Sequence, residues 1–161
     1  MFQLFKKKQG GIEIGAPVKG KAVPISEVSD PTFGEEILGK GVAFYPTEGK
    51  IFAPADGTID LLFDTMHAVS MTTTDGVELL IHIGLETVAL KGQHFTAHKA
   101  TGDTVKKGDL LISVDLDALK GLGIDTITPM VVCNTGDYQA VEAVTGQDVE
   151  PGTAVLHVTK L

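Results

Sequence analysis

The segment His67-Ala-Val-Ser-Met-Thr-Thr-Thr-Asp-Gly-Val-Glu-Leu-Leu-Ile-His-Ile-Gly84 contains two short apolar runs around a Thr73-Thr74-Asp75-Gly76 turn. Apolar runs of this length on either side of turn residues predict two antiparallel strands joined by a hairpin. If those four residues form the loop, His67 lies directly opposite His82. Side chains opposite one another in such a pair have Cβ atoms about 4.5–5.5 Å apart. The segment therefore predicts two imidazoles on one face of a sheet, close enough to hold one small charged group between them.

Alternation along the second strand separates its side chains into two faces. Leu79, Ile81 and Ile83 share one face, which we predict to be core. The other face carries both polar and apolar side chains. Apolar neighbours keep an imidazole on this face neutral, and a neutral imidazole has a nucleophilic ring nitrogen. That face is expected to carry Glu78, Leu80 and His82, together with His67, Val69 and Met71 of the partner strand.

The rest of the chain also reads as short β segments broken by Gly, Pro, Asp and Asn, with 19 glycines in all. This pattern predicts an all-β fold, an antiparallel β-sandwich or barrel. Short helical turns are expected after Asp30, with Pro31 at the first helical position, and after Asp115. Two internal similarities predict that the fold is pseudo-duplicated: residues 16–23 resemble 53–60, and residues 102–111 resemble 146–155.

The composition limits the classes of function. The chain has 161 residues, 43% of them apolar, which suffices for one domain with a core. A formal net charge of −8 argues against a nucleic-acid partner. All 13 basic residues are lysine, so the chain has no guanidinium group of its own with which to clamp a phosphate. Any arginine needed for phosphoryl chemistry must come from a partner.

The ends and the cysteine content bear on location. Residues 1–11 are expected to form a loose basic lead that frays, and residues 12–161 a single domain. No apolar run approaches the ~20 residues of a membrane span, and the lead lacks the apolar stretch of a secretory signal. The single cysteine, Cys133, cannot form an internal disulfide. These features predict a cytoplasmic protein.

Residues 76–92, Gly-Val-Glu-Leu-Leu-Ile-His-Ile-Gly-Leu-Glu-Thr-Val-Ala-Leu-Lys-Gly, resemble the active-site signature of a known family. The family is the glucose-family enzyme IIA of the bacterial phosphoenolpyruvate:sugar phosphotransferase system. The resemblance runs from about residue 13 to the end of the chain. Further stretches that resemble the family are residues 30–33, 39–49, 53–59, 65–70 and 128–134.

The resemblance implies an all-β sandwich and a phosphoryl carrier that needs no cofactor. It implies that Nε2 of His82 accepts the phosphoryl group from the carrier protein HPr and passes it to a cysteine on the IIB domain of a sugar permease. His67 would donate a hydrogen bond to the phosphoryl oxygens, and the hydroxyl of Thr65 would orient one of the two rings. These roles make His82, His67 and Thr65 the expected catalytic residues.

The resemblance also implies how partners bind. An apolar rim around the site would receive them and exclude water from the labile phosphohistidine. Contact with the membrane would occur only through the permease, and the unphosphorylated form would be suited to regulate other transporters or enzymes. Two positions depart from the family pattern: Met66 stands where a polar residue is common, and His94 where glycine is usual. The rim is expected to comprise Val42, Phe44, Phe52, Phe63 and Leu80.

Two other functions fit part of the pattern. A zinc-dependent hydrolase of a related β fold would use His67 and His82 as ligands, but a catalytic zinc takes a third protein ligand that the sequence does not supply clearly. The same pair would also suit a zinc ion shared with a partner. A lipoyl or biotinyl carrier would need a lysine at the tip of the hairpin, and the Thr73–Gly76 turn has none.

Overall fold

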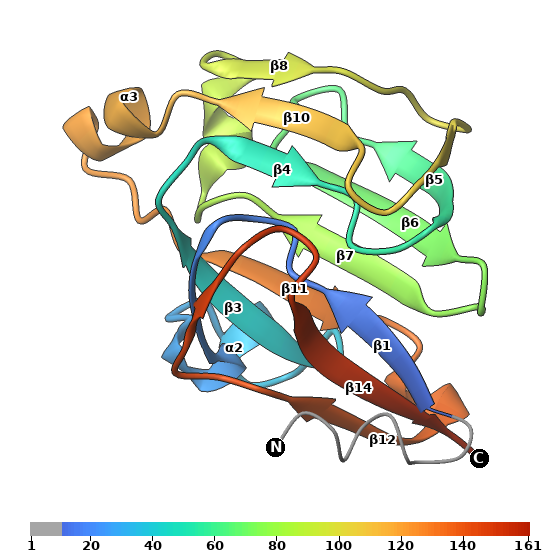
Figure 1. Cartoon of the computed structure of the whole chain (residues 1–161). Coiled ribbons are helices and arrows are strands. Elements are labelled where there is room, and N and C mark those ends of the chain that lie inside the picture. The colour runs from blue at the N-terminus through green and yellow to red at the C-terminus, as the bar shows by residue number, and fades with distance from the viewer. Residues whose placement is uncertain (1–10) are drawn as a thin grey trace.

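The computed structural model describes residues 11–161 as a set of antiparallel strands with a few short helical turns (Figure 1). The expected basic lead, apart from Gly11, lies outside the described residues. None of the helices in residues 11–161 has the length and apolar character needed to cross a membrane. The strands are β1 Gly11–Gly15, β2 Gly20–Pro24, β3 Lys40–Pro46, β4 Lys50–Phe52, β5 Gly57–Leu62, β6 Ala68–Thr73, β7 Glu78–His82, β8 Phe95–Ala97, β9 Thr104–Val105, β10 Leu110–Val114, β11 Thr128–Val132, β12 Tyr138–Ala143, β13 Asp148–Val149 and β14 Ala154–Lys160.

The strands form three sheets in which every neighbouring pair is antiparallel. One sheet has eight strands in the order β13-β2-β3-β11-β7-β6-β5-β9. Two three-stranded sheets, β4-β10-β8 and β1-β14-β12, lie against one face of it, in front of the large sheet in Figure 1. The prediction of an all-β antiparallel sandwich is therefore confirmed.

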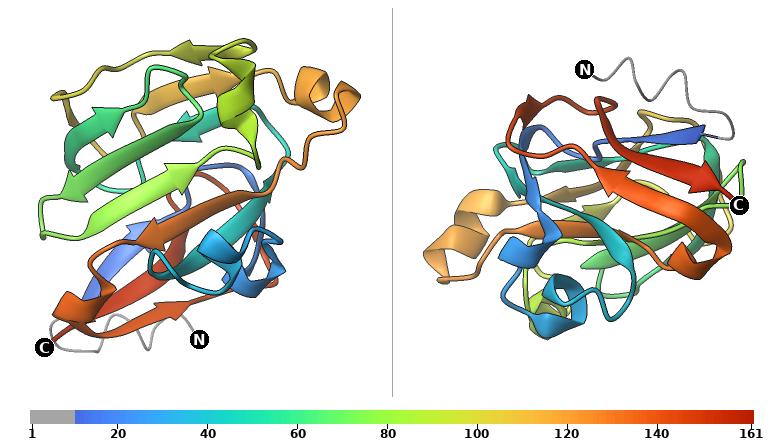
Figure 2. Two further views of the ribbon diagram at one scale, coloured as in Figure 1. Left: turned by 180° about the vertical axis from the view of Figure 1, so that it is seen from behind. Right: turned by 90° about the horizontal axis from the view of Figure 1, so that it is seen from below.

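The two faces of the large sheet bury different clusters. The main core fills the space between the sheets and contains Phe44, Met71, Leu79 and Ile81. On the opposite face a smaller cluster, which includes Val23, Phe33 and Val131, lies beneath the short helices. Those helices cover part of this outer face, as the view from behind shows (Figure 2). They are η1 Ile25–Glu27 and α2 Pro31–Gly34; the remaining ones are η2 Thr87–Leu90, α3 Leu116–Gly121 and η3 Thr135–Asp137.

Both predicted helical turns form where their caps were expected. The Asp30 side chain accepts a hydrogen bond from the N–H of Thr32, and Pro31 is the first helical residue of α2. The Asp115 side chain accepts one from the N–H of Ala118 at the start of α3. Each carboxylate satisfies an N–H group that the helix itself leaves without a partner.

The backbone hydrogen bonds repeat in the two halves of the chain. The N–H of Gly152 donates to the carbonyl of Ala16, and the N–H of Gly108 donates to that of Ala53, both at 2.9 Å. Strand β13 pairs with β2 in the first half just as β9 pairs with β5 in the second. The pseudo-duplication predicted from the sequence is thus visible in the main-chain bonding.

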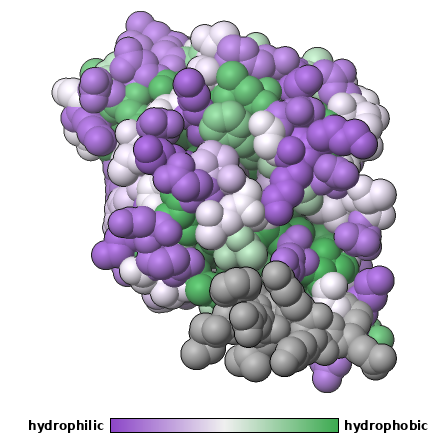
Figure 3. All heavy atoms as spheres, in the orientation of Figure 1, coloured by the Kyte–Doolittle hydropathy of each residue, from purple (hydrophilic) through white to green (hydrophobic). Residues whose placement is uncertain are grey.

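On the face that carries the two small sheets, in the part that Figure 3 shows in colour, hydrophilic residues predominate and surround several smaller apolar patches. Among the large apolar side chains that remain exposed, Ile37 and Leu38 follow α2, and Val88 lies in η2. These two helical segments flank the end of β7, where His82 lies. Exposed apolar residues therefore occur in or after the two helical segments beside His82, and others lie elsewhere on the described surface, at Tyr45, Leu61, Leu122 and Leu161.

Candidate functional site

The β6–β7 hairpin sets the position of His82 and differs from the predicted register by one residue. Ala68, not His67, pairs with His82. The N–H of Thr73 donates to the carbonyl of Val77, and Gly76, at φ +93°, closes a loop of three residues rather than four. Three-residue hairpin loops of this kind need one residue in the left-handed region, and glycine supplies it. The predicted direct pairing of the two histidines is therefore wrong.

A shift of one residue turns every side chain of β6 to the other face. Val69 and Met71, expected beside His82, belong to the main core. Ala68 and Ser70 take their place on the outer face, opposite His82 and Leu80. The prediction for β7 itself is confirmed, because Leu79 and Ile81 are buried while Leu80 and His82 are only partly so.

His67 nevertheless reaches His82, because it lies just before β6 and follows a turn at Met66. The N–H of Met66 donates to the carbonyl of Phe63 at 2.7 Å, which forms a tight turn, and Met66 has a φ of +57°. The ring centroids of His67 and His82 are 5.1 Å apart, with an angle of 76° between the ring planes. The N–H of Ile83 donates to the carbonyl of His67 at 2.7 Å, so strand pairing places His67 beside the end of β7 and the turn directs its ring toward His82.

Each imidazole has one nitrogen fixed by a neighbour. Nδ1 of His82 lies 2.7 Å from the carbonyl oxygen of Gly84, and Nδ1 of His67 lies 2.5 Å from the hydroxyl oxygen of Thr65. A carbonyl oxygen only accepts, so Nδ1 of His82 carries the proton and Nε2 carries the lone pair. The structure thus brings together the three residues expected to be catalytic and leaves both Nε2 atoms outside these bonds.

Aromatic rings surround the pair. The ring of Phe63 meets His67 edge-on at 5.3 Å, and the ring of Phe33 lies 5.1 Å from that of His82. Phe33 was not among the expected rim residues, although the cap at Asp30 that places it was read from the sequence. Leu80 packs against the cluster that includes Phe33. These contacts form an apolar surround for the two rings.

The expected rim is wrong at two positions and unsupported at a third. Val42 and Phe44 have no exposed surface and belong to the main core, so neither can meet a partner. Phe52 lies on β4, in a three-stranded sheet that does not carry the histidines. Of the five expected residues, Phe63 and Leu80 are partly exposed on the face of the site.

Burial lowers the pKa of both histidines. The pKa of His67 is lowered by burial and then by the neighbouring His82. The pKa of His82 is lowered mainly by burial, against the opposing effects of the Gly84 carbonyl and the charge of Asp30. Both rings are therefore neutral near pH 7, as a nucleophile and a hydrogen-bond donor require.

The lowered pKa values predict a pH dependence of stability. Below about pH 6.5 the unfolded chain binds protons that the folded site resists, so the free energy of unfolding falls as the pH drops through that range. Urea denaturation at a series of pH values should show a weaker dependence for the double variant His67→Gln/His82→Gln. Equal pH dependence in the variant and the wild type would contradict this.

Gly84 holds the carbonyl that fixes the tautomer of His82. Its φ is +70°, and a Cβ there would lie 2.9 Å from Cγ2 of the buried Thr87. We expect Gly84→Ala to lower the free energy of unfolding by about 1–3 kcal/mol and to slow reactions at His82 about tenfold. Gly123→Ala is the control, because Gly123 has a φ of +76° with nothing within 4 Å of the added Cβ. Equal losses in the two variants would show that only backbone strain matters.

The two departures from the family pattern share a backbone property. Met66 and His94 both have positive φ, +57° and +76°. Asparagine and glycine adopt this region more readily than methionine, which accounts for the expectation of a polar residue at 66 and of glycine at 94. Both positions therefore carry strain in this chain.

Relief of that strain is testable at His94. We expect His94→Gly to raise the free energy of unfolding by about 0.5–1 kcal/mol, since the gain at positive φ exceeds the entropy cost of glycine. Chemical denaturation measures it. His98→Gly, at an exposed position without positive φ, should instead destabilise the fold. A destabilised His94→Gly would show that the imidazole contributes more than its backbone costs.

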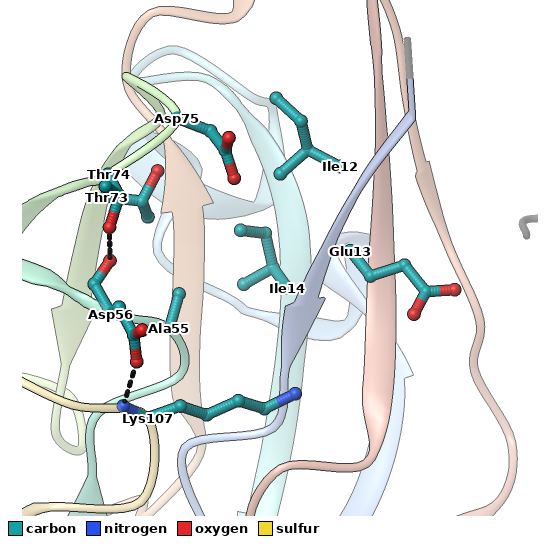
Figure 4. A pocket seen from close by; sticks show the side chains of 9 residues that line it. All are labelled: Ile12, Glu13, Ile14, Ala55, Asp56, Thr73, Thr74, Asp75 and Lys107. Carbon is teal, nitrogen blue, oxygen red and sulfur yellow. Dashed lines mark hydrogen bonds between the residues drawn. The ribbon is translucent and has the colours of Figure 1, made fainter. Parts of the chain in front are cut away.

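A pocket of about 370 Å³ lies at the other end of the β6–β7 hairpin (Figure 4). The N–H of Lys107 donates to the carboxylate of Asp56 at 2.8 Å, and the Thr74 hydroxyl donates to the Asp56 carbonyl at 3.2 Å. These hydrogen bonds join neighbouring turns to one another and so have a structural role. The pocket contains neither histidine, and the candidate site remains the His67–His82 pair.

Metal binding by the pair would need more ligands. Within residues 11–161 no group of three or more His, Cys, Asp or Glu side chains is placed to hold a metal ion. His67 and His82 together provide two nitrogen ligands, whereas a catalytic zinc takes three protein ligands.

The hairpin tip, Thr74 to Gly76, has no lysine to carry a lipoyl or biotinyl group.

Comparison with known proteins gives consistent results. Residues 12–138 match the family described as phosphoenolpyruvate-dependent sugar phosphotransferase system, EIIA 1. A glucose-specific EIIA component of Oceanobacillus iheyensis is 38% identical over 94% of this chain and 92% of that protein. Among solved structures, the glucose permease IIA from Mycoplasma capricolum superimposes with a TM-score of 0.83 and 34% identity, over 91% of this chain and 95% of that one.

Longer relatives contain the same segment. A beta-glucoside-specific EIIBCA component of Dickeya chrysanthemi is 42% identical over 84% of this chain. The chain spans only 21% of that protein's length. The segment therefore occurs both in proteins of this length and within larger ones.

Proposed function

The chain belongs to the EIIA 1 family of the phosphoenolpyruvate-dependent sugar phosphotransferase system, and we propose that it carries a phosphoryl group on Nε2 of His82. The observation that carries the proposal is the 2.7 Å contact between Nδ1 of His82 and the carbonyl of Gly84. This contact makes Nδ1 the protonated nitrogen and leaves the Nε2 lone pair available. A neutral imidazole with a free lone pair is a competent nucleophile toward phosphorus.

Uptake is a direct exchange of one nitrogen–phosphorus bond for another. Nε2 of His82 attacks the phosphorus of the phosphohistidine on HPr, the new N–P bond forms as the old one breaks, and the HPr imidazole leaves. No proton has to move on the His82 ring, because Nδ1 already holds its proton against Gly84. The lowered pKa of His82 keeps the nucleophile unprotonated near pH 7.

His67 is proposed to stabilise the transferred group. If the Thr65 hydroxyl donates to Nδ1 of His67, Nε2 of His67 carries a proton and becomes a donor. With the ring centroids 5.1 Å apart, that N–H is close to any group on Nε2 of His82. A fixed donor aimed at phosphoryl oxygens stabilises the charge that they carry during transfer.

The onward step is proposed to deliver the group to a cysteine thiolate of a IIB domain. The sulfur attacks phosphorus, an S–P bond forms, the N–P bond to His82 breaks, and the neutral imidazole is restored. The matching segment within EIIBCA components supports a IIB domain as the receiver. The apolar surround of Phe33, Phe63 and Leu80 would exclude water while a partner is bound.

Charge also fits a basic partner. The chain carries a net charge of −8 and no arginine, so it cannot supply a guanidinium to the transition state. Asp30 lies close enough to affect the pKa of His82 and would attract a cationic partner to the site. Positive charge during transfer would thus come from HPr or from the IIB domain.

Mapping of the phosphorylated residue tests this function. Incubation with phosphoenolpyruvate, enzyme I and HPr should add one acid-labile phosphoryl group per chain. Peptide mass spectrometry at alkaline pH should place it on His82. Phosphate on any other residue, or none at all, would overturn the proposal.

A further inference from the structure

The loop that follows η2 contacts the turn that carries His67. Gly92, in this loop, has a φ of +89°. A Cβ at Gly92 would lie 3.1 Å from Cε of Met66, and 3.9 Å from the carbonyl oxygens of Asp64 and Thr65. The space left by the missing side chain is therefore closed off by the end of the Met66 side chain and by the backbone of the turn.

Met66 connects this contact to the site. It stands between Thr65 and His67, whose hydroxyl and Nδ1 form the 2.5 Å contact. Its partly buried side chain packs against the main core, as does Leu90 just before the loop. Because Met66 also holds a strained φ of +57°, its backbone depends on packing to stay in place. A side chain at position 92 that is too large for the end of Met66 to move aside would therefore press on the turn itself, because the carbonyl oxygens of Asp64 and Thr65 lie only 3.9 Å from the added Cβ.

We infer that Gly92 is a positioning residue for His67, acting through Met66. The absence of a side chain at Gly92 lets the Met66 methyl group settle there, which holds the Thr65–Met66–His67 turn and aims Nε2 of His67 at His82. The loop that follows the proposed acceptor thus sets the orientation of the proposed donor. The inference rests on the role proposed for His67 in transfer.

The test measures His67 directly as well as through transfer. Nitrogen-15 NMR of the unphosphorylated protein reports the protonation and hydrogen bonding of each imidazole nitrogen. We expect Gly92→Leu to change the His67 signals and to slow onward transfer to the IIB domain about tenfold, with uptake from HPr changed less than about twofold. Gly92→Ala, which moves Met66 by less, should give a smaller change in the same direction.

Gly102→Leu and Gly102→Ala are matched controls. Gly102 has a φ of +91°, so a side chain there strains the backbone as much as one at Gly92 does. Nothing lies within 4 Å of a Cβ added at Gly102, so this Cβ meets no neighbour comparable to Met66. Both should leave the His67 signals and the transfer rates unchanged. Equal effects at Gly92 and Gly102 would overturn the inference, as would unchanged His67 signals in Gly92→Leu.

A second substitution provides a rescue. Met66→Asn removes Cε, and asparagine adopts positive φ without the packing that methionine needs there, so Gly92→Ala/Met66→Asn should recover the His67 signals and the onward rate. Failure of the rescue would show that the contact with Met66 is not the cause. Failure of the proposed function would look different: the wild-type protein would take up no phosphate on His82, while the NMR comparison of the variants would still test the positioning.

Discussion

His82→Gln is expected to abolish phosphoryl uptake from phospho-HPr. Glutamine is neutral and close in size to histidine, so the apolar surround of Phe33 and Leu80 should persist. Its amide nitrogen has no lone pair for attack on phosphorus, because that pair is delocalised into the carbonyl. The rate of uptake should therefore fall by more than about a thousandfold. Radiolabel transfer from phosphoenolpyruvate, with enzyme I and HPr in excess, measures it.

His98→Gln is the control for this experiment. His98 is exposed, and its Nε2 contacts the hydroxyl of Ser113 at 2.7 Å on the β8–β10 sheet, away from the histidine pair. The variant should take up phosphate at the wild-type rate. Thermal denaturation of His82→Gln establishes that the fold is intact. Appreciable uptake by folded His82→Gln would remove His82 from the mechanism.

The pairing of the two histidines shows what strand periodicity can and cannot predict. Alternation placed Leu79 and Ile81 in the core, which is confirmed, because both lie within a regular strand. Loop length is not fixed by periodicity, and the choice between three and four loop residues depended on Gly76 taking a positive φ. The proximity of His67 to His82 was nonetheless predicted, although the structure achieves it by a turn at Met66.

The error in the apolar rim has a different physical cause. β3 is an interior strand of the large sheet, with Phe44 in the main core and Ala43 in the cluster beneath the short helices. A strand buried on both faces reads as a continuous apolar run, so its sequence does not show which side chains reach a surface. Phe33 lay in a segment whose helical start was predicted, but its contact with His82 depends on packing between residues far apart in the chain.

His67→Gln is expected to separate the two transfer steps. Uptake uses a neutral imidazole as nucleophile, so no new negative charge approaches the phosphoryl group. Onward transfer uses a thiolate, whose charge adds to that of the phosphoryl oxygens, and a fixed donor beside them matters more. We expect uptake to stay within a few-fold of wild type and onward transfer to fall by roughly 10²–10³.

Single-turnover kinetics separates the steps: uptake from phospho-HPr first, then loss of label from purified phosphoprotein on addition of a IIB domain. Thr65→Val provides a graded comparison, because it keeps His67 and removes only the hydroxyl 2.5 Å from Nδ1. Free to change tautomer, His67 would donate from Nε2 only part of the time, so onward transfer should fall less than in His67→Gln. Equal losses of rate in both steps for His67→Gln would instead assign His67 a role in uptake as well as in onward transfer. An unchanged onward rate would show that His67 does not stabilise the transferred group.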